Sequence, residues 1–281
     1  MSSLDKLRPI AGEHSIQEAI FTILLEDKIT SPQQFKKLHT GNLKKQLPKF
    51  HLVKREEDTP RHALDSTSIR SQATPKKGKI VGFGFDDIDA DTGAIRGRLR
   101  GTNDHVSWIY ANILKYPGYD RVKKDILAWF RKIASFQKNM KVKAISVHYI
   151  DHLYWESEKS VPRSLVFSAS SKHLPKDLLN RQGWDFENSY RFKENGLDRI
   201  AHVGILEQRN VKNNHTRFVI DMDLQYLLPK ARSLRAFLND KGSEGYSALC
   251  DRLHDDNKDY LRDMLSKDVS DMIGLNKGSS K

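Results

Sequence analysis

Two aspartates, Asp221 and Asp223, stand two positions apart in the apolar run Phe218–Leu224. Alternate side chains of a strand project from the same face, so both carboxylates would lie on one face together with Val219 and Gln225. Such a pair can hold Mg²⁺ through substrate phosphates, which would support phosphotransfer or nuclease chemistry. A strand with one face in water has the same pattern. Asp221 and Asp223 are therefore the metal candidates of the chain, beside this simpler interpretation.

The acidic run Asp86–Gly93 places Asp87, Asp89 and Asp91 at the first, third and fifth positions of a calcium loop. The sixth position of such a loop requires Gly for a sharp turn, and the twelfth requires a bidentate Glu. Here these positions hold Thr92 and Arg98. The run is therefore interpreted as a charged hairpin turn.

Three further motifs lack a position that their chemistry requires. His148 and His152 could chelate zinc on a helix, but their β-branched and aromatic neighbours predict a strand, in which they would lie roughly 13 Å apart. Cys250 and His254 have the spacing of a thiol and a base on one helical turn, but Cys250 borders an apolar stripe. Gly82–Gly84 lacks the third glycine of a dinucleotide site. We expect no catalytic residue and no cofactor, which favours a protein that is not an enzyme but leaves the question open.

The composition indicates a positively charged surface. The 281 residues carry a formal net charge of +12, which attracts nucleic acid, an anionic membrane surface or an acidic protein. A single cysteine, Cys250, excludes an internal disulfide framework and fits a reducing compartment. No secretory leader and no apolar run near ~20 residues is present, so we expect a cytoplasmic protein without a membrane segment.

The clearest helix of the sequence spans Tyr119–Gln137, with apolar residues at helical spacing from Val122 to Ile133. Trp129 and Phe130 belong to this apolar side and are expected in the core. Basic residues gather on and beside the opposite face, between residues 121 and 143. They predict binding of nucleic acid or an acidic partner, and a solvated helix face is the alternative: Arg121, Lys124, Arg131, Lys132, Lys138, Lys141 and Lys143.

The remaining patterns predict an α+β fold in which antiparallel sheets pack against helices. Strands are expected at Ile16–Leu25 (where capping-box spacing would also allow a helix), Phe50–Lys54, Ile80–Phe85, Ala94–Arg100, Val106–Ile113, Lys143–Trp155, Ser164–Ser168, Tyr190–Gln208 and His215–Leu228. Helices are expected from Ser31 to about Leu47, over Ser233–Asn239, and over Ser243 to about Ile273.

Strands are followed by a helix in each half of the chain, which suggests two consecutive sheet-plus-helix units at 1–142 and 143–281. One continuous domain is the alternative. Residues 56–79 are polar and contain two Thr-Pro steps, which predict a long flexible loop ending in the basic cluster Lys76–Lys79.

Four short motifs resemble a family of uncharacterised bacterial proteins of similar length: Glu18–Phe21, Val147–Asp151, Ile220–Asp223, and Leu253-His254 followed by Tyr260. In that family the second motif reads Leu-Arg-Tyr-Ile-Asn, so His148 and Asp151 are departures from it. The resemblance implies an α+β protein without an established activity, often encoded near mobile or defence-related genes.

Together these observations predict a non-enzymatic binding or accessory protein of a bacterial cytoplasm, in a phage-defence or toxin–antitoxin-like module. It would act through a surface that takes a protein or a polyanion. Direct nucleic-acid binding is the first alternative, and a metal-dependent phosphotransfer or nuclease activity through Asp221 and Asp223 is the second. The oligomeric state is left open.

Overall fold

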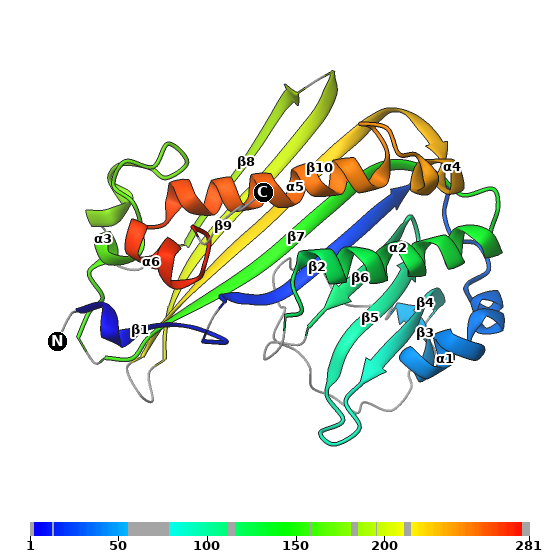
Figure 1. Cartoon of the computed structure of the whole chain (residues 1–281), viewed down its shortest axis with the longest axis horizontal. Coiled ribbons are helices and arrows are strands. Elements are labelled where there is room, and N and C mark those ends of the chain that lie inside the picture. The colour runs from blue at the N-terminus through cyan, green and yellow to red at the C-terminus, as the bar shows by residue number, and fades with distance from the viewer. Residues whose placement is uncertain are drawn as a thin grey trace.

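A single antiparallel sheet of ten strands forms the centre of the protein (Figure 1). The structure, a computed structural model, describes residues 3–12, 14–55, 79–111, 116–157, 159–180, 185–194, 196–210 and 215–276. The strand order is β3-β4-β5-β6-β2-β7-β10-β9-β8, and β1 pairs with the end of β7. The strands are β1 (Leu7–Pro9), β2 (Ile16–Leu25), β3 (Lys49–Arg55), β4 (Lys79–Ile88), β5 (Ile95–Thr102), β6 (His105–Tyr110), β7 (Lys141–Trp155), β8 (Asp185–Glu194), β9 (Leu197–Arg209) and β10 (Thr216–Ser233).

The helices vary widely in length. Two of them are long, α2 (Tyr119–Phe136) and α5 (Tyr246–Met264). The shorter α-helices and 3₁₀ turns are η1 (Ser3–Lys6), η2 (Pro32–Leu38), α1 (Gly41–Gln46), α3 (Arg163–Val166), η3 (Leu178–Asn180), α4 (Leu234–Asn239) and α6 (Lys267–Met272).

The two halves of the chain share this one sheet. In the first half, the strands β3 to β6 return in order to pair with β2, and α2 follows; in the second half, β8 to β10 return to pair with β7, and α4 and α5 follow. The halves join where β2 and β7 pair antiparallel, with Phe21 opposite Val147. The α+β class is therefore confirmed, but the described residues form one sheet and not two, because β2 of the first half pairs with β7 of the second.

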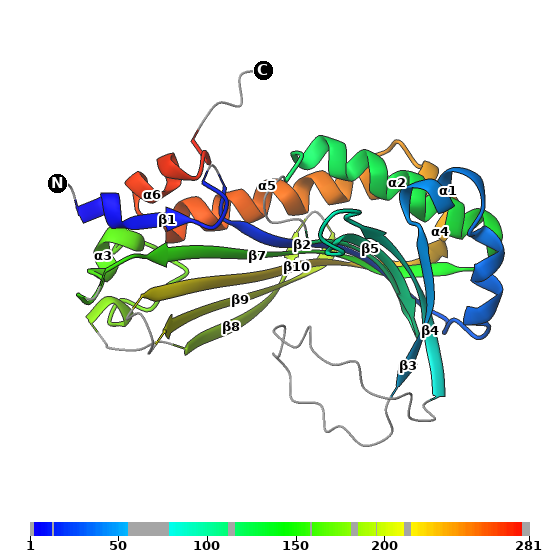
Figure 2. The ribbon, with the colours of Figure 1, turned by 90° about the horizontal axis from the view of Figure 1, so that it is seen from below.

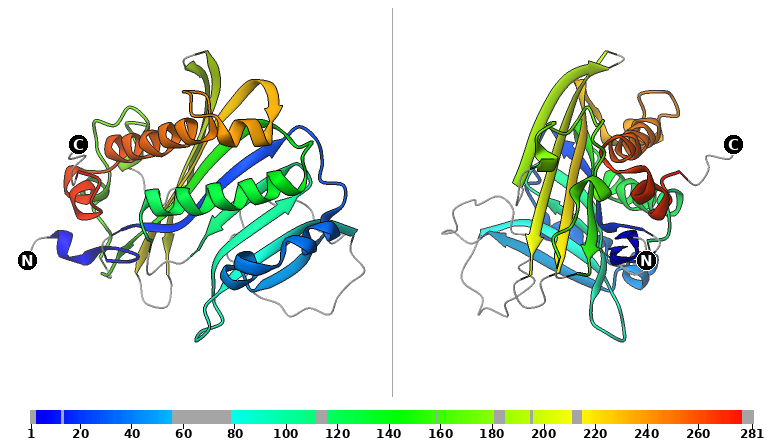
Figure 3. Two further views of the ribbon diagram at one scale, coloured as in Figure 1. Left: turned by 45° about the vertical axis from the view of Figure 1, so that its right-hand side comes forward. Right: turned by 90° about the vertical axis from the view of Figure 1, so that its left-hand side faces the viewer.

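Helices cover one face of the sheet (Figures 2 and 3). Burial alternates along β9 and β10, so that residues such as Val203 and Met222 are buried while their neighbours are partly exposed. Burying one apolar face of a sheet requires a second layer, which the helices supply. The helix α2 contributes Ile126 and Trp129, and α5 contributes Leu253, to the same core.

Most predicted elements are confirmed. Ile16–Leu25 is a strand and not a helix. The segment Ser31–Leu47 contains two short helical turns, η2 and α1, where one helix was expected. Trp129 and Phe130 lie in the core as expected.

Three further predictions were wrong. The expected strand Tyr190–Gln208 is divided between β8 and β9, which pair antiparallel. Ser164–Ser168 is not a strand: α3 occupies most of it, and only the bridge between Phe167 and Leu265 is β-like. The expected single C-terminal helix is broken after Met264, because Leu265 is extended and the Ser266 side chain caps α6 by accepting a hydrogen bond from the backbone N–H of Val269.

The loop prediction for 56–79, with most of its basic cluster, lies outside the described residues. Within the described ranges, none of the helices combines the length and the apolar character needed to cross a membrane.

Candidate functional site

Three of the basic residues predicted to bind a partner project from α2. Arg121, Lys124 and Arg131 are exposed, at spacings that place them on the outer side of the helix. Arg121 pairs with Asp125, four residues away, at 3.4 Å. Arg131 donates a hydrogen bond of 3.3 Å to a backbone carbonyl of α4. Only Lys124 of the three has its charge free of a described partner.

Of the other four predicted residues, Lys132 lies on α2, Lys138 lies between α2 and β7, and Lys141 and Lys143 lie at the start of β7. The ammonium group of Lys132 lies 4.9 Å from the ring centroid of Trp129, and Lys138 is exposed after the helix ends. Lys141 pairs with Glu26 at 3.2 Å, and Lys143 pairs with Asp104 at 3.6 Å. The seven residues therefore do not form one uniform patch, because local carboxylates pair with several of them.

Four lysines outside the predicted segment are better placed. Lys36 and Lys37 on η2, and Lys44 and Lys45 on α1, are exposed, and none of them has an ion pair among the described residues. Phe35 of η2 packs against Phe136 of α2, with ring centroids 5.2 Å apart. The turn η2 therefore lies beside α2, although residues 39–118 separate the two elements in the sequence.

A groove lies between α1 and the start of α2. It has a volume of about 310 Å³ and is lined by Lys45 at the end of α1 and by Arg121 and Asp125 at the start of α2. Trp108 and Trp129 also line it, with ring centroids 6.1 Å apart. The groove therefore brings Lys45 of α1 and Arg121 of α2 to one part of the surface.

The charge is unequally divided between the halves. Lys and Arg exceed Asp and Glu by ten in residues 1–142 and by only two in residues 143–281. This boundary follows the middle of the sheet, between β2 and β7. The division was visible in the sequence, but only the fold shows that β3 to β6, α1 and α2 lie together at one end of the molecule, while β1 lies at the other (Figure 1).

The aspartate pair of β10 projects from the face of the sheet opposite the helices. Asp221 Oδ1 lies 2.7 Å from Nε2 of His148, while Asp223 accepts hydrogen bonds from Ser146 and Gln225. Burial would lower the pKa of His148, but its hydrogen bond with Asp221 and the charges of both aspartates outweigh burial and raise it. The two carboxylates thus have separate protein partners. In the described part of the chain, no three His, Cys, Asp or Glu side chains are grouped as metal ligands.

The acidic run Asp86–Gly93 and the pair Cys250 and His254 do not form the calcium loop and the thiol–base pair that their spacing allowed. The acidic run forms the β4–β5 turn, in which Asp89 Oδ1 accepts hydrogen bonds from the backbone N–H groups of Asp91 and Thr92. Cys250 is buried, and burial raises the pKa of its thiol to about 11, so it is protonated at neutral pH. His254 hydrogen-bonds with Tyr149 and not with Cys250.

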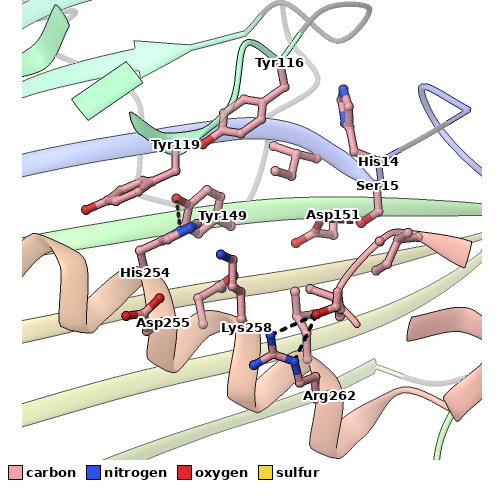
Figure 4. Close-up of a pocket in the computed structure, with 16 residues that line it drawn as sticks. His14, Ser15, Tyr116, Tyr119, Tyr149, Asp151, His254, Asp255, Lys258 and Arg262 are labelled. Atoms are coloured by element: carbon pink, nitrogen blue, oxygen red, sulfur yellow. Dashed lines mark hydrogen bonds between the residues drawn. The ribbon is translucent and has the colours of Figure 1, made fainter. Parts of the chain in front are cut away.

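A polar cavity of about 440 Å³ lies on the helix-covered side of the sheet (Figure 4). Residues 14–16, strand β7, helix α5 and the segment 273–275 form its walls. Asp151 and Lys258 face it, together with Tyr149 and His254. Sequence reasoning missed this site. A signal existed, because the odd-numbered neighbours of Asp151, among them Tyr149 and Leu153, are the apolar residues of β7, which places Asp151 on the covered face.

Comparisons with protein-family models, with curated proteins and with solved structures found no match. The resemblance to a family of uncharacterised bacterial proteins therefore stays a prediction. The fold and its surfaces define an α+β protein with one helix-covered antiparallel sheet and one strongly basic end.

Proposed function

We propose that this protein binds nucleic acid through its lysine surface, which we define as Lys36, Lys37, Lys44, Lys45 and Lys124. The observation that carries the proposal is that these five cations are exposed and have no described ion pair, on elements that lie close together: η2 packs against α2, and α1 and α2 line one groove. Lysines in water retain their full charge for a partner. Contacts between such side chains and phosphates release counterions and supply most non-specific affinity for nucleic acid.

The composition of this surface favours nucleic acid over an acidic protein. Protein interfaces are depleted of Lys and enriched in aromatic residues, Met and Arg, which anchor the partner in pockets. Among the described residues, the one large hydrophobic side chain that is exposed is Phe192, on β8 in the other half of the sheet. A lysine surface without an aromatic anchor suits a backbone-directed, largely sequence-independent interaction. In this proposal the protein is a binding protein and not an enzyme.

Fluorescence anisotropy with labelled double-stranded DNA and RNA of mixed sequence tests the proposal. The wild-type protein should bind at low salt, and log K should fall linearly with log salt concentration by about 0.9 for each phosphate contacted. The quadruple variant Lys36→Glu, Lys37→Glu, Lys44→Glu and Lys45→Glu should bind at least roughly tenfold more weakly and with a smaller salt slope.

The matched control reverses the same number of charges in the other half. Lys172, Lys176, Lys230 and Lys241 are exposed lysines whose ammonium groups have no described ion pair, so changing all four to Glu alters the net charge equally. This control should retain most of the affinity. Equal losses in the two quadruple variants would refute the lysine surface, and absence of binding by the wild type at low salt would refute nucleic-acid binding altogether. An acidic protein would then be the remaining partner class.

A further inference from the structure

The cavity beside α5 contains a carboxylate that the core does not neutralise. Asp151 lies on the helix-covered face of β7 with only 2% of its surface exposed. Its Oδ1 accepts a hydrogen bond of 2.7 Å from the Ser15 hydroxyl. No Lys, Arg or His of the described chain lies within ion-pair distance of it. Burial raises the pKa of this carboxyl to about 6, so most molecules carry a buried negative charge at neutral pH.

A cation faces the same cavity from α5. Lys258 is half-buried, and its ammonium group makes no hydrogen bond or ion pair with the described residues. Figure 4 shows this group turned into the cavity, between His254 and Asp151. Lys258 and Asp151 are not an ion pair with each other. Two opposite charges thus face one space without neutralising one another, although a buried unpaired charge is costly.

Two further charged residues, Asp255 and Arg262, line the cavity, and Arg262 pairs with Asp259 at 2.6 Å, while aromatic side chains form the wall beside Lys258. The Tyr149 hydroxyl and Nδ1 of His254 are joined by a hydrogen bond of 2.9 Å. The Tyr119 ring stacks on the His254 imidazole at 3.8 Å, and its hydroxyl donates to Asp251. Burial first, and then the nearby charge of Lys258, lower the pKa of His254 to about 3, so the imidazole is neutral. The aromatic wall therefore adds shape and apolar contact but no charge.

We propose that this cavity binds a small zwitterion of the size of a free α-amino acid, with its ammonium group on Asp151 and its carboxylate on Lys258. A ligand with a positive charge alone would leave Lys258 unpaired and be repelled by it. A ligand with a negative charge alone would be repelled by Asp151. A zwitterion pairs both groups at once, and the cavity volume lies in the range of small-molecule sites. This site is separate from the lysine surface, and its existence does not depend on nucleic-acid binding.

Isothermal titration calorimetry of the full chain against each of the standard amino acids tests the proposal. At least one should bind with a dissociation constant in the millimolar range or below. For that amino acid, the amide derivative keeps only the positive charge and the N-acetyl derivative keeps only the negative charge. Each should bind at least roughly tenfold more weakly than the parent. Equal binding of either derivative would overturn the zwitterion assignment, and no binding by any amino acid would overturn the site.

Variants locate the two charges. Asp151→Asn and Lys258→Met should each weaken the parent amino acid by at least roughly tenfold. In Asp151→Asn, which lacks the repelling carboxylate, the N-acetyl derivative should bind about as well as the parent amino acid. In Lys258→Met, which lacks the repelling ammonium group, the amide derivative should bind about as well as the parent. Asp91→Asn and Lys241→Met change exposed side chains elsewhere and should bind as the wild type does. Matching thermal unfolding of all four variants separates lost contacts from lost folding, and unchanged affinity in folded Asp151→Asn or Lys258→Met would refute the proposal.

Discussion

Replacement of Asp151 by asparagine should stabilise the protein at neutral pH and not in acid. The folded carboxyl has its pKa raised from 3.8 to about 6 by burial. Between these two values the folded state holds a proton that the unfolded state has lost, so the free energy of unfolding of the wild type falls as pH rises through this window. At 1.36 kcal/mol for each unit of pKa, the loss reaches about 3 kcal/mol above pH 6. Asparagine keeps the shape and can accept the Ser15 hydrogen bond, but it has no charge to bury.

Urea denaturation at a series of pH values measures this effect. The difference in free energy of unfolding between Asp151→Asn and the wild type should be smallest near pH 4 and should rise by about 3 kcal/mol toward pH 7.5. Asp91→Asn is the matched control, because Asp91 is exposed at the β4–β5 turn and its carboxylate has no described partner. A difference for Asp151→Asn that does not change with pH would refute the view that the buried carboxylate is ionised without a counter-ion.

Two further predictions concern the second half of the chain. Arg199 is buried and pairs with Glu194 at 2.9 Å and with Asp256 at 2.7 Å. Arg199→Met leaves both carboxylates without this ion pair, so it should lower the free energy of unfolding by about 3 kcal/mol in urea titrations. A loss below about 1 kcal/mol would mean that water already screens this network. The buried Cys250 thiol, with its pKa raised to about 11, should react with an aromatic disulfide reagent much more slowly in the native protein than in denaturant, as followed by absorbance, and equal rates would contradict its burial.

Local patterns were sufficient for most elements of this fold. The strand Ile16–Leu25 and the helix around Val122–Ile133 follow from apolar periodicity, which depends only on near neighbours in the sequence. The rejection of a calcium loop at Asp86–Gly93 also needed only the identities of Thr92 and Arg98. The secondary structure of short apolar segments was predicted less reliably. Ser164–Ser168 was predicted as a strand, but α3 occupies most of it, because a five-residue segment is too short to distinguish the two periodicities.

Composition and periodicity alone specify the chemistry of the surfaces: residues 1–142 have an excess of positive charge, and polar side chains alternate along β10. Only the tertiary structure decided which of these groups meet. The β2–β7 pairing, which makes one sheet of two halves, and the proximity of η2 to α2 are contacts between distant segments. The position of α5 over β7 places Asp151 and Lys258 in one cavity. Periodicity indicates that a strand has two faces, but the packing of helices decides which face is buried.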